Sequence, residues 1–493
     1  MRNKGNVGID YRSVSVVAGY LLVVEFAMLI IPAVVSICYG EETWTCFMPA
    51  LFAAFGGGVL LILAGGGHKR TIHLGRRESY LLTSGIWVLY SLVGMLPFMF
   101  YIYPLNAVDA FFETISGFTT TGATVYGDVE RLSHGVLLWR SMLQWIGGLG
   151  IVIFMLAVLP SLNQEGGVPM YNAETTGIVH DKLHPRIRQT AKSLWTLYLG
   201  LTIVLILLLW LGPMSLFDAV CQALTTISTG GFSTRNASIA AWQSDYTAWI
   251  ISIFMLIGGV NFMLLYGVLR GDVKALLRND VFRTFVGIVL TAWAAMAAIL
   301  LLNDSTISIS DALLWPLFQV ASTITTTGFS YGPYETWGPA VLIIIICLMF
   351  VGACAGSTTG AVKVDRFVAL WKNMINEIEI TLFPHHLKGV TVNGRTLTSA
   401  QLSKISAFFM IYIILTVIGA LVMADYGYSF TDSFFASASC IGNNGLGYGA
   451  TGAGGGFGTL PDVVKLVFSL SMLIGRLEIF TVVVLASRKF WVR

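Results

Sequence analysis

Ten long apolar runs constrain this 493-residue chain more than any other feature of its sequence. A helix needs about 20 consecutive apolar residues to cross the hydrocarbon core of a bilayer. Runs of that length lie near residues 14–38, 47–67, 79–103, 136–160, 193–212, 246–269, 284–302, 339–371, 404–424 and 463–487. Only 11% of the residues are charged, which is too few to cover a soluble protein of this size, whereas lipid accepts an apolar surface. We therefore expect an all-α membrane protein.

Lysine and arginine residues gather between these runs in a pattern that indicates the orientation of the chain. They form six clusters, at residues 2–12, 69–77, 182–192, 270–283, 363–404 and 488–493. Positive charge marks the cytoplasmic side, so we expect both termini in the cytoplasm.

The net charge of +3 is too small to suggest a nucleic-acid partner, and the first apolar run is too long for a cleaved signal peptide. Cys38 and Cys46 flank the first external loop, where either a disulfide or two free thiols fits.

Four shorter segments lie between alternate apolar runs, near residues 107–126, 216–235, 311–331 and 430–449. They are too short to cross the membrane, and both flanks of each fall on the outside, so we interpret them as re-entrant loops. They are internal repeats, which align on Gly122, Gly231, Gly328 and Gly445 as T-T-T-G, S-T-G-G, T-T-T-G and G-N-N-G. One such motif is a weak signal, but four in register between apolar runs are a strong one.

An aspartate lies thirteen residues before the aligned glycine in three of the repeats, at Asp109, Asp218 and Asp432. The third repeat has Trp315-Pro316 there, with its aspartate at 311. Aspartate caps the free N–H groups at a helix start, and proline in the first turn has a related effect. We therefore expect each segment to be a capped short helix followed by an extended, glycine-containing strand.

The four strands predict a pathway for a monovalent cation. Non-helical backbone at membrane depth is tolerated only inside protein or along a water-filled path, and rings of carbonyl oxygens can replace the hydration shell of an ion. The short helices would direct their partly negative C-terminal ends at this path. The expected ion ligands are Thr120, Thr121, Gly122, Gly230, Gly231, Thr326, Thr327, Gly328, Asn443, Asn444 and Gly445. Glu113 lies in the first short helix. It could hydrogen-bond the backbone of the ion-binding strand from behind or add negative potential, and a purely structural role fits equally well.

These features resemble the TrkH-type potassium uptake subunits of the Trk/Ktr/HKT superfamily, over nearly the whole chain. The most specific segments are Leu143-Gln-Trp-Ile-Gly-Gly-Leu-Gly150, Pro185-Arg-Ile-Arg-Gln-Thr-Ala-Lys192, Gly352–Gly360 with Val362-Lys-Val364, and Gly475-Arg-Leu-Glu478. With the repeats, the resemblance implies a two-helix extension (1–73) and four repeats of helix, pore helix and helix arranged pseudo-fourfold around a central pore. The expected repeats span residues 74–165, 166–282, 283–400 and 401–493, the third with a broken second helix.

The resemblance also implies properties that composition and spacing do not show. These are potassium as the transported ion, the bacterial cytoplasmic (inner) membrane as location, a homodimer with one pore per subunit, and a cytosolic nucleotide-binding RCK-type (TrkA-like) regulatory subunit. Two segments depart from the family pattern. Gly445-Leu-Gly447 stands where Gly-Pro-Gly is frequent, and Gly356-Ser-Thr-Thr-Gly-Ala361 stands where Gly-Ser-Thr-Gly-Gly-Gly is frequent.

Two unusual features suggest a gate on the inner side of the filter. Arg476 lies about midway along the last apolar run, where a charge costs a few kcal/mol and usually faces a cavity. Similar proteins use it as an electrostatic barrier to cations; the alternative is a structural ion pair or a cap for free carbonyls. The second feature is a polar, glycine-rich stretch formed by Gly352, Gly356, Ser357, Thr358, Thr359 and Gly360. It fits a loop across the pore, or else a packing kink.

Two other classes of function deserve comparison. A sodium- or proton-coupled symporter usually shows inverted repeats and membrane-embedded carboxylates, whereas these repeats all run in one direction. A membrane enzyme would need a nucleophile motif, metal cluster or phosphate loop, and the sequence contains none of them. We therefore expect no enzymatic activity and no cofactor besides the transported ion.

Overall fold

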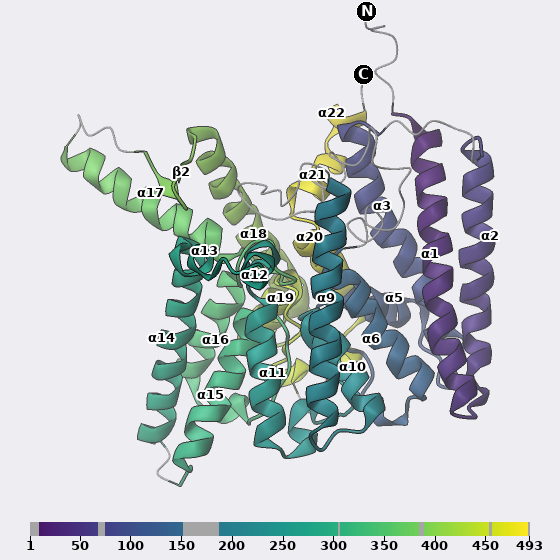
Figure 1. The fold of residues 1–493 in the computed structure, drawn as a ribbon, viewed down its shortest axis with the longest axis horizontal. Coiled ribbons are helices and arrows are strands. Elements are labelled where there is room, and N and C mark those ends of the chain that lie inside the picture. Colours follow the sequence, from purple (N-terminus) through teal and green to yellow (C-terminus); the bar gives the residue numbers. More distant parts are fainter. Residues whose placement is uncertain are drawn as a thin grey trace, which may run out of the picture.

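The computed structural model describes residues 9–67, 74–150, 187–303, 306–383, 389–452 and 456–491. These residues are mostly helical, with one short antiparallel hairpin of β1 (Thr391–Val392) and β2 (Arg395–Thr396). The expectation of an all-α membrane protein is confirmed. The N-terminal end of α1 and the short helix α22 lie at the same end of the molecule (Figure 1).

Six helices in the described residues are long and apolar enough to cross a membrane, and eight if each of two bent pairs is one span. The six agree with six expected runs. They are α1 (Tyr11–Cys38), η1 (Glu42–Phe47) with α2 (Met48–Ala64), α3 (Arg76–Gly94) with α4 (Leu96–Met99), α9 (Ile187–Trp210), α14 (Asp280–Asn303) and α18 (Ser399–Asp425).

Two runs expected as single spans are bent helix pairs. The chain turns by 105° between α11 (Asp245–Gly258) and α12 (Phe262–Leu269), and by 117° between α20 (Asp462–Arg476) and α21 (Phe480–Ala486). The first bend has a local cause, because the Asn261 side-chain oxygen accepts hydrogen bonds from the Met263 and Leu264 N–H groups and starts a new helix.

The two remaining runs are divided or only partly described. The run at 339–371 consists of α16 (Pro339–Val351), a non-helical segment, and α17 (Val364–Leu382). The run at 136–160 begins as α6 (His134–Gly148). Its residues after 150 lie outside the described residues, as do the expected boundary at 165/166 and residues 182–186 of the basic linker 182–192.

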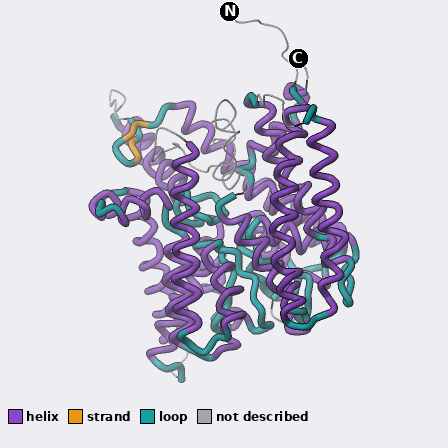
Figure 2. Tube along the Cα trace, turned by 45° about the vertical axis from the view of Figure 1, so that its right-hand side comes forward, coloured by secondary structure: helices purple, strands orange, loops and turns teal. Residues whose placement is uncertain are grey.

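The four short helices inside the molecule recur with one geometry. They are α5 (Ala107–Phe118), α10 (Leu216–Ile227), α15 (Ile309–Ile324) and α19 (Phe430–Ile441). Each ends four residues before its aligned glycine, at Gly122, Gly231, Gly328 or Gly445. Figure 2 shows loop segments running through the middle of the helical body.

The prediction that aspartates cap these short helices is wrong. The N-cap side chains are Asn106, Ser215, Ser308 and Ser429, which accept from the N–H groups of Asp109, Asp218, Asp311 and Asp432. Each aspartate is therefore the third helical residue. The 16-residue α15 is about one turn longer than the other three, which have 12. This extra turn moves its aspartate to 311 and places Pro316 inside the helix rather than at its start.

Short elements connect these parts. They are η2 (Val129–Arg131), η4 (Ser238–Trp242), α13 (Val273–Arg278), η5 (Tyr334–Thr336), η6 (Gly449–Thr451), η7 (Phe457–Thr459) and α22 (Arg488–Trp491). Cys38 and Cys46 are both free thiols, the first exposed and the second buried.

Candidate ion pathway

The strands after the four short helices share one backbone conformation. The residue two positions before each aligned glycine has a φ of 53°: Thr120, Thr229, Thr326 and Asn443. The glycines follow with φ values of 85°, 83°, 81° and 72°. Positive φ is uncommon for residues other than glycine. Because it recurs at the same position in all four repeats, the fold must impose it there. We call residues 119–123, 228–232, 325–329 and 442–446 the filter strands.

The four filter strands meet one another in a closed ring. A Cβ added at Gly122 would lie within 3 Å of the Gly230 carbonyl oxygen, and one at Gly231 would be equally close to that of Thr327. The same clash joins Gly328 to Asn444 and Gly445 to Thr121. The contacts pass from the first repeat to the second, third and fourth and then return to the first. Only glycine combines this close approach with its positive φ.

Threonine, serine and asparagine side chains hold the strands from behind and from the sides. Thr119 and Thr121 share a 2.8 Å hydrogen bond between their hydroxyl groups, and Thr325 and Thr327 share an identical one. Asn443 donates to the Thr121 hydroxyl at 3.1 Å, and Asn444 donates to the Thr323 carbonyl at 2.8 Å. All these residues are fully buried, and the bonds run within one strand or between neighbouring repeats.

The segment 352–360 lies against the inner ends of the short helices. Thr358 donates to the carbonyls of Ile227, at the end of α10, and of Gly258 in α11, at 3.2 and 3.3 Å. The Gly360 N–H donates to the Thr326 hydroxyl at 2.9 Å, and the Ala361 N–H donates to the Gly442 carbonyl at 3.0 Å. The segment and the residue after it therefore contact the second, third and fourth repeats next to their filter strands.

Arg476 connects this segment to the first repeat. Its Nη1 donates to the Thr358 carbonyl at 2.6 Å, and its Nη2 donates to the carbonyls of Gly147 and Gly148 at 2.7 Å each. The guanidinium thus caps carbonyls of both the loop and the end of α6. The nearby carboxylate of Glu478 pairs with Arg366. The sequence left two interpretations of Arg476, a cap for free carbonyls and an electrostatic barrier to cations. This geometry is compatible with both.

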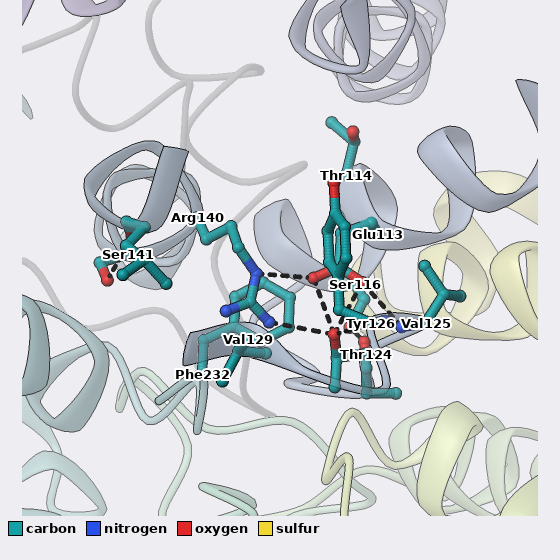
Figure 3. Close-up of polar contacts among 12 residues, drawn as sticks. Glu113, Thr114, Ser116, Thr124, Val125, Tyr126, Val129, Arg140, Ser141 and Phe232 are labelled. Carbon is teal, nitrogen blue, oxygen red and sulfur yellow. Dashed lines mark hydrogen bonds and ion pairs between the residues drawn. The ribbon is translucent and has the colours of Figure 1, made fainter. Parts of the chain in front are cut away.

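An ion pair that the sequence analysis missed lies behind the first filter strand (Figure 3). Arg140 in α6 contacts Glu113 in α5 at 2.7 Å, with exposed side-chain fractions of 2% and 0%. Glu113 also accepts from the Val125 N–H at 2.9 Å. Arg140 donates to the Thr124 hydroxyl at 3.0 Å and to the Ser233 carbonyl at 3.2 Å.

Arg140 therefore links the segments that follow the first and second filter strands, through the Thr124 hydroxyl and the Ser233 carbonyl. A charge inside an apolar run was the signal that singled out Arg476, and it applies equally to Arg140 in the run at 136–160. Asp109 also has an unexpected partner, because Lys465 of α20 binds its carboxylate at 2.5 Å. In the described residues, no group of three or more His, Cys, Asp or Glu side chains is placed to hold a metal ion.

Comparisons with known proteins agree with this architecture. A family model described as "TrkH: Cation transport protein" matches residues 50–492. The Trk system potassium uptake protein TrkH of Salmonella typhimurium is 35% identical over 487 residues, covering 98% of this chain and all of the relative. TrkG of Escherichia coli is 34% identical over 97% of this chain and 98% of its own. The crystal structure of the potassium transporter TrkH from Vibrio parahaemolyticus matches with a TM-score of 0.86 and 31% identity, over 98% of this chain and 100% of that one.

Proposed function

The chain belongs to the TrkH family of cation transport proteins, and from this premise we propose that it takes up potassium through a channel-like pore formed by the four filter strands. The chain is a membrane transporter and not an enzyme. The observation that carries the proposal is the closed ring of four filter strands, each with the same positive-φ pattern.

A ring of this kind suits a dehydrated monovalent cation. Carbonyl oxygens supply several ligands without fixed charge, and the ends of four short helices add partial negative charge. The filter residues of this proposal are those expected from the sequence: Thr120, Thr121, Gly122, Gly230, Gly231, Thr326, Thr327, Gly328, Asn443, Asn444 and Gly445. Potassium is favoured because the curated relatives are named potassium uptake proteins.

We further propose that Arg476 and the loop 352–360 form the closed gate. The guanidinium places positive charge in a low-dielectric passage, where it repels a cation more strongly than in bulk water. The loop carries glycines at both ends, which tolerate large backbone changes. Movement of the loop would break its hydrogen bond to Arg476 and open the inner passage.

The proposed setting is the cytoplasmic membrane of a bacterium, with both termini inside, a homodimer, and a separate cytosolic nucleotide-binding subunit that controls the gate. Support comes from the charge pattern of the sequence and from the names of the relatives, which describe them as parts of a Trk system.

Potassium flux into liposomes containing the purified protein tests the function. A channel-like pore should carry potassium down its own gradient without an opposing sodium or proton gradient. Flux that requires such a gradient would favour the symporter instead. Gly231→Ser should lower the preference for potassium over sodium, because the new Cβ collides with the Thr327 carbonyl. Unchanged ion preference after substitution of each of the four aligned glycines would contradict the filter assignment.

A further inference from the structure

The second filter strand lacks a hydrogen bond that holds the other three. In the first, third and fourth repeats, a serine six residues before the aligned glycine donates to the carbonyl one residue after it. The three bonds are Ser116 to Ala123 at 2.5 Å, Ser322 to Phe329 at 2.7 Å and Ser439 to Leu446 at 2.8 Å. The second repeat has Thr225 at this position, and its hydroxyl donates to carbonyls of its own helix instead.

Gln144 of α6 binds the second strand in place of the missing serine. Its Nε2 donates to the Gly230 carbonyl at 2.6 Å, and its Oε1 accepts from the Phe232 N–H at 3.0 Å. The two bonds lie on either side of Gly231 and run in opposite directions. A side chain must carry both a donor and an acceptor to make them, and the carboxamide of glutamine does so. Gln144 is fully buried, so water does not compete for these bonds.

The position of Gln144 is special within the molecule itself. The helices that follow the four filter strands are α6, α11, α16 and α20. Near its C-terminal end each has a four-residue motif that finishes in glycine: Gln144-Trp-Ile-Gly147, Met255-Leu-Ile-Gly258, Met349-Phe-Val-Gly352 and Met472-Leu-Ile-Gly475. The first residue of the motif is fully buried in all four, and three of the four are methionine. Methionine has no N–H donor, so the methionine side chains lack the donor that Gln144 uses on Gly230.

We propose that Gln144 is a specificity-determining residue of the pore, which acts by holding the second filter strand and by occupying one filter carbonyl. The carbonyls just before the aligned glycines belong to Thr121, Gly230, Thr327 and Asn444. In the described part of the chain, only that of Gly230 accepts a hydrogen bond. The oxygen of the second repeat is thus a weaker ligand than the other three, and the cation site is asymmetric. This inference rests on the proposed function.

Gln144→Met tests the inference, because it installs the residue of the other three repeats at similar volume. The Gly230 carbonyl and the Phe232 N–H would lose their partner, and the strand could then adapt to a smaller ion. We expect the potassium-to-sodium permeability ratio in liposomes to fall about five-fold, the factor that corresponds to one net hydrogen bond. Met255→Leu, at the matching position of the second repeat, should leave the ratio unchanged.

Two further variants separate the roles of Gln144. Gln144→Glu keeps the size of the side chain and the acceptor for the Phe232 N–H but loses the donor to the Gly230 carbonyl. It should therefore also lower the potassium-to-sodium permeability ratio. If Gln144→Met does not fold, Gln144→Glu tests the inference in its place. Adding Thr225→Ser to Gln144→Met supplies the serine of the other repeats and should restore most of the preference. A wild-type ratio in folded Gln144→Met or Gln144→Glu overturns the inference, and a low ratio in the double variant overturns its strand-holding part. Absence of potassium flux in the wild type would instead contradict the proposed function.

Discussion

Arg140 and Glu113 show how single side chains hold the backbone next to the proposed pore. Both are buried, and both contact backbone that follows a filter strand: Glu113 at the Val125 N–H and Arg140 at the Ser233 carbonyl. The Arg140 guanidinium also lies 4.2 Å from the centre of the Phe232 ring, a favourable cation–π distance. Because these partners belong to two repeats, the ion pair couples the first repeat to the second.

Removal of either charge should be costly, because the partner would remain buried without compensation. We expect Arg140→Gln or Glu113→Gln each to destabilise the protein by roughly 3–5 kcal/mol, and the double variant by less than the sum of the two. Thermal unfolding of the detergent-solubilised protein measures this. Arg131 pairs with Asp128 with 75% of its side chain exposed, so Arg131→Gln is the control and should cost at most about 1 kcal/mol. Equal effects of Arg140→Gln and Arg131→Gln would show that the buried pair has no special structural role.

At the scale of elements, the non-helical segment between α16 and α17 lies where all four repeats meet, at the inner end of the proposed pore. It binds the ends of α10 and α19 and the third filter strand, and Arg476 connects it to α6. These contacts use hydroxyl groups and backbone rather than apolar packing. Ala353, Cys354 and Val362 of the same segment are buried in apolar clusters. The polar stretch 356–360 between them, which hydrogen bonds hold, is therefore the part best able to move without disturbing the core.

Arg476→Ala should therefore raise potassium flux when no regulatory subunit is present. The substitution removes both the charge and the bond to the Thr358 carbonyl. We expect an increase of roughly ten-fold, which corresponds to about 1.4 kcal/mol of barrier, with little change in ion preference. Shortening the loop 352–360 should have the same direction of effect. Arg131→Ala, at an exposed outer residue, is the control. Unchanged or abolished flux in a folded Arg476→Ala protein would identify Arg476 as a structural residue.

At the scale of the whole molecule, the described parts of two basic segments meet on one face. Lys372 in α17 contacts Asp280 at the start of α14 at 2.9 Å and donates to the Thr391 carbonyl in β1. The Asp280 N–H in turn donates to the side chain of Asn393 in the hairpin. This cluster joins the end of the 270–283 segment to the 363–404 segment, and α17 continues from the loop of the proposed gate. A partner bound here could act on that loop.

The purified chain alone should not bind nucleotides tightly, because its polar connections are too short to form a nucleotide-binding domain of about 50 residues or more. Calorimetric titration with adenine nucleotides tests this, and a separately purified regulatory ring is the positive control. Tight binding by the isolated chain would contradict the assignment of nucleotide sensing to a partner.

The sequence by itself determined the class of the protein, and it predicted the four repeats and the residues proposed as the filter. These features depend on local signals: apolar length, the spacing from aspartate to the aligned glycine in three of the repeats, and glycine where the chain needs positive φ. A charge within an apolar run indicated Arg476, and a polar, glycine-rich stretch indicated residues 352–360. For the capping aspartates, the error was a shift of three residues along helices whose existence was correct. For the runs at 246–269 and 463–487, the error was larger, because each expected span is a bent pair of helices.

Only the tertiary structure decided which groups meet across the repeats. Residues Arg140 and Glu113, Gln144 and Gly230, and Arg476 and Thr358 are separated by 27, 86 and 118 positions in the chain. Sequence periodicity reports which face of a helix is apolar, but it contains no information on the neighbour that covers this face. Such long-range packing decides three features. They are the closed ring of filter strands, the bends after Gly258 and Arg476, and the binding of the second filter strand by Gln144 where the other repeats use a serine.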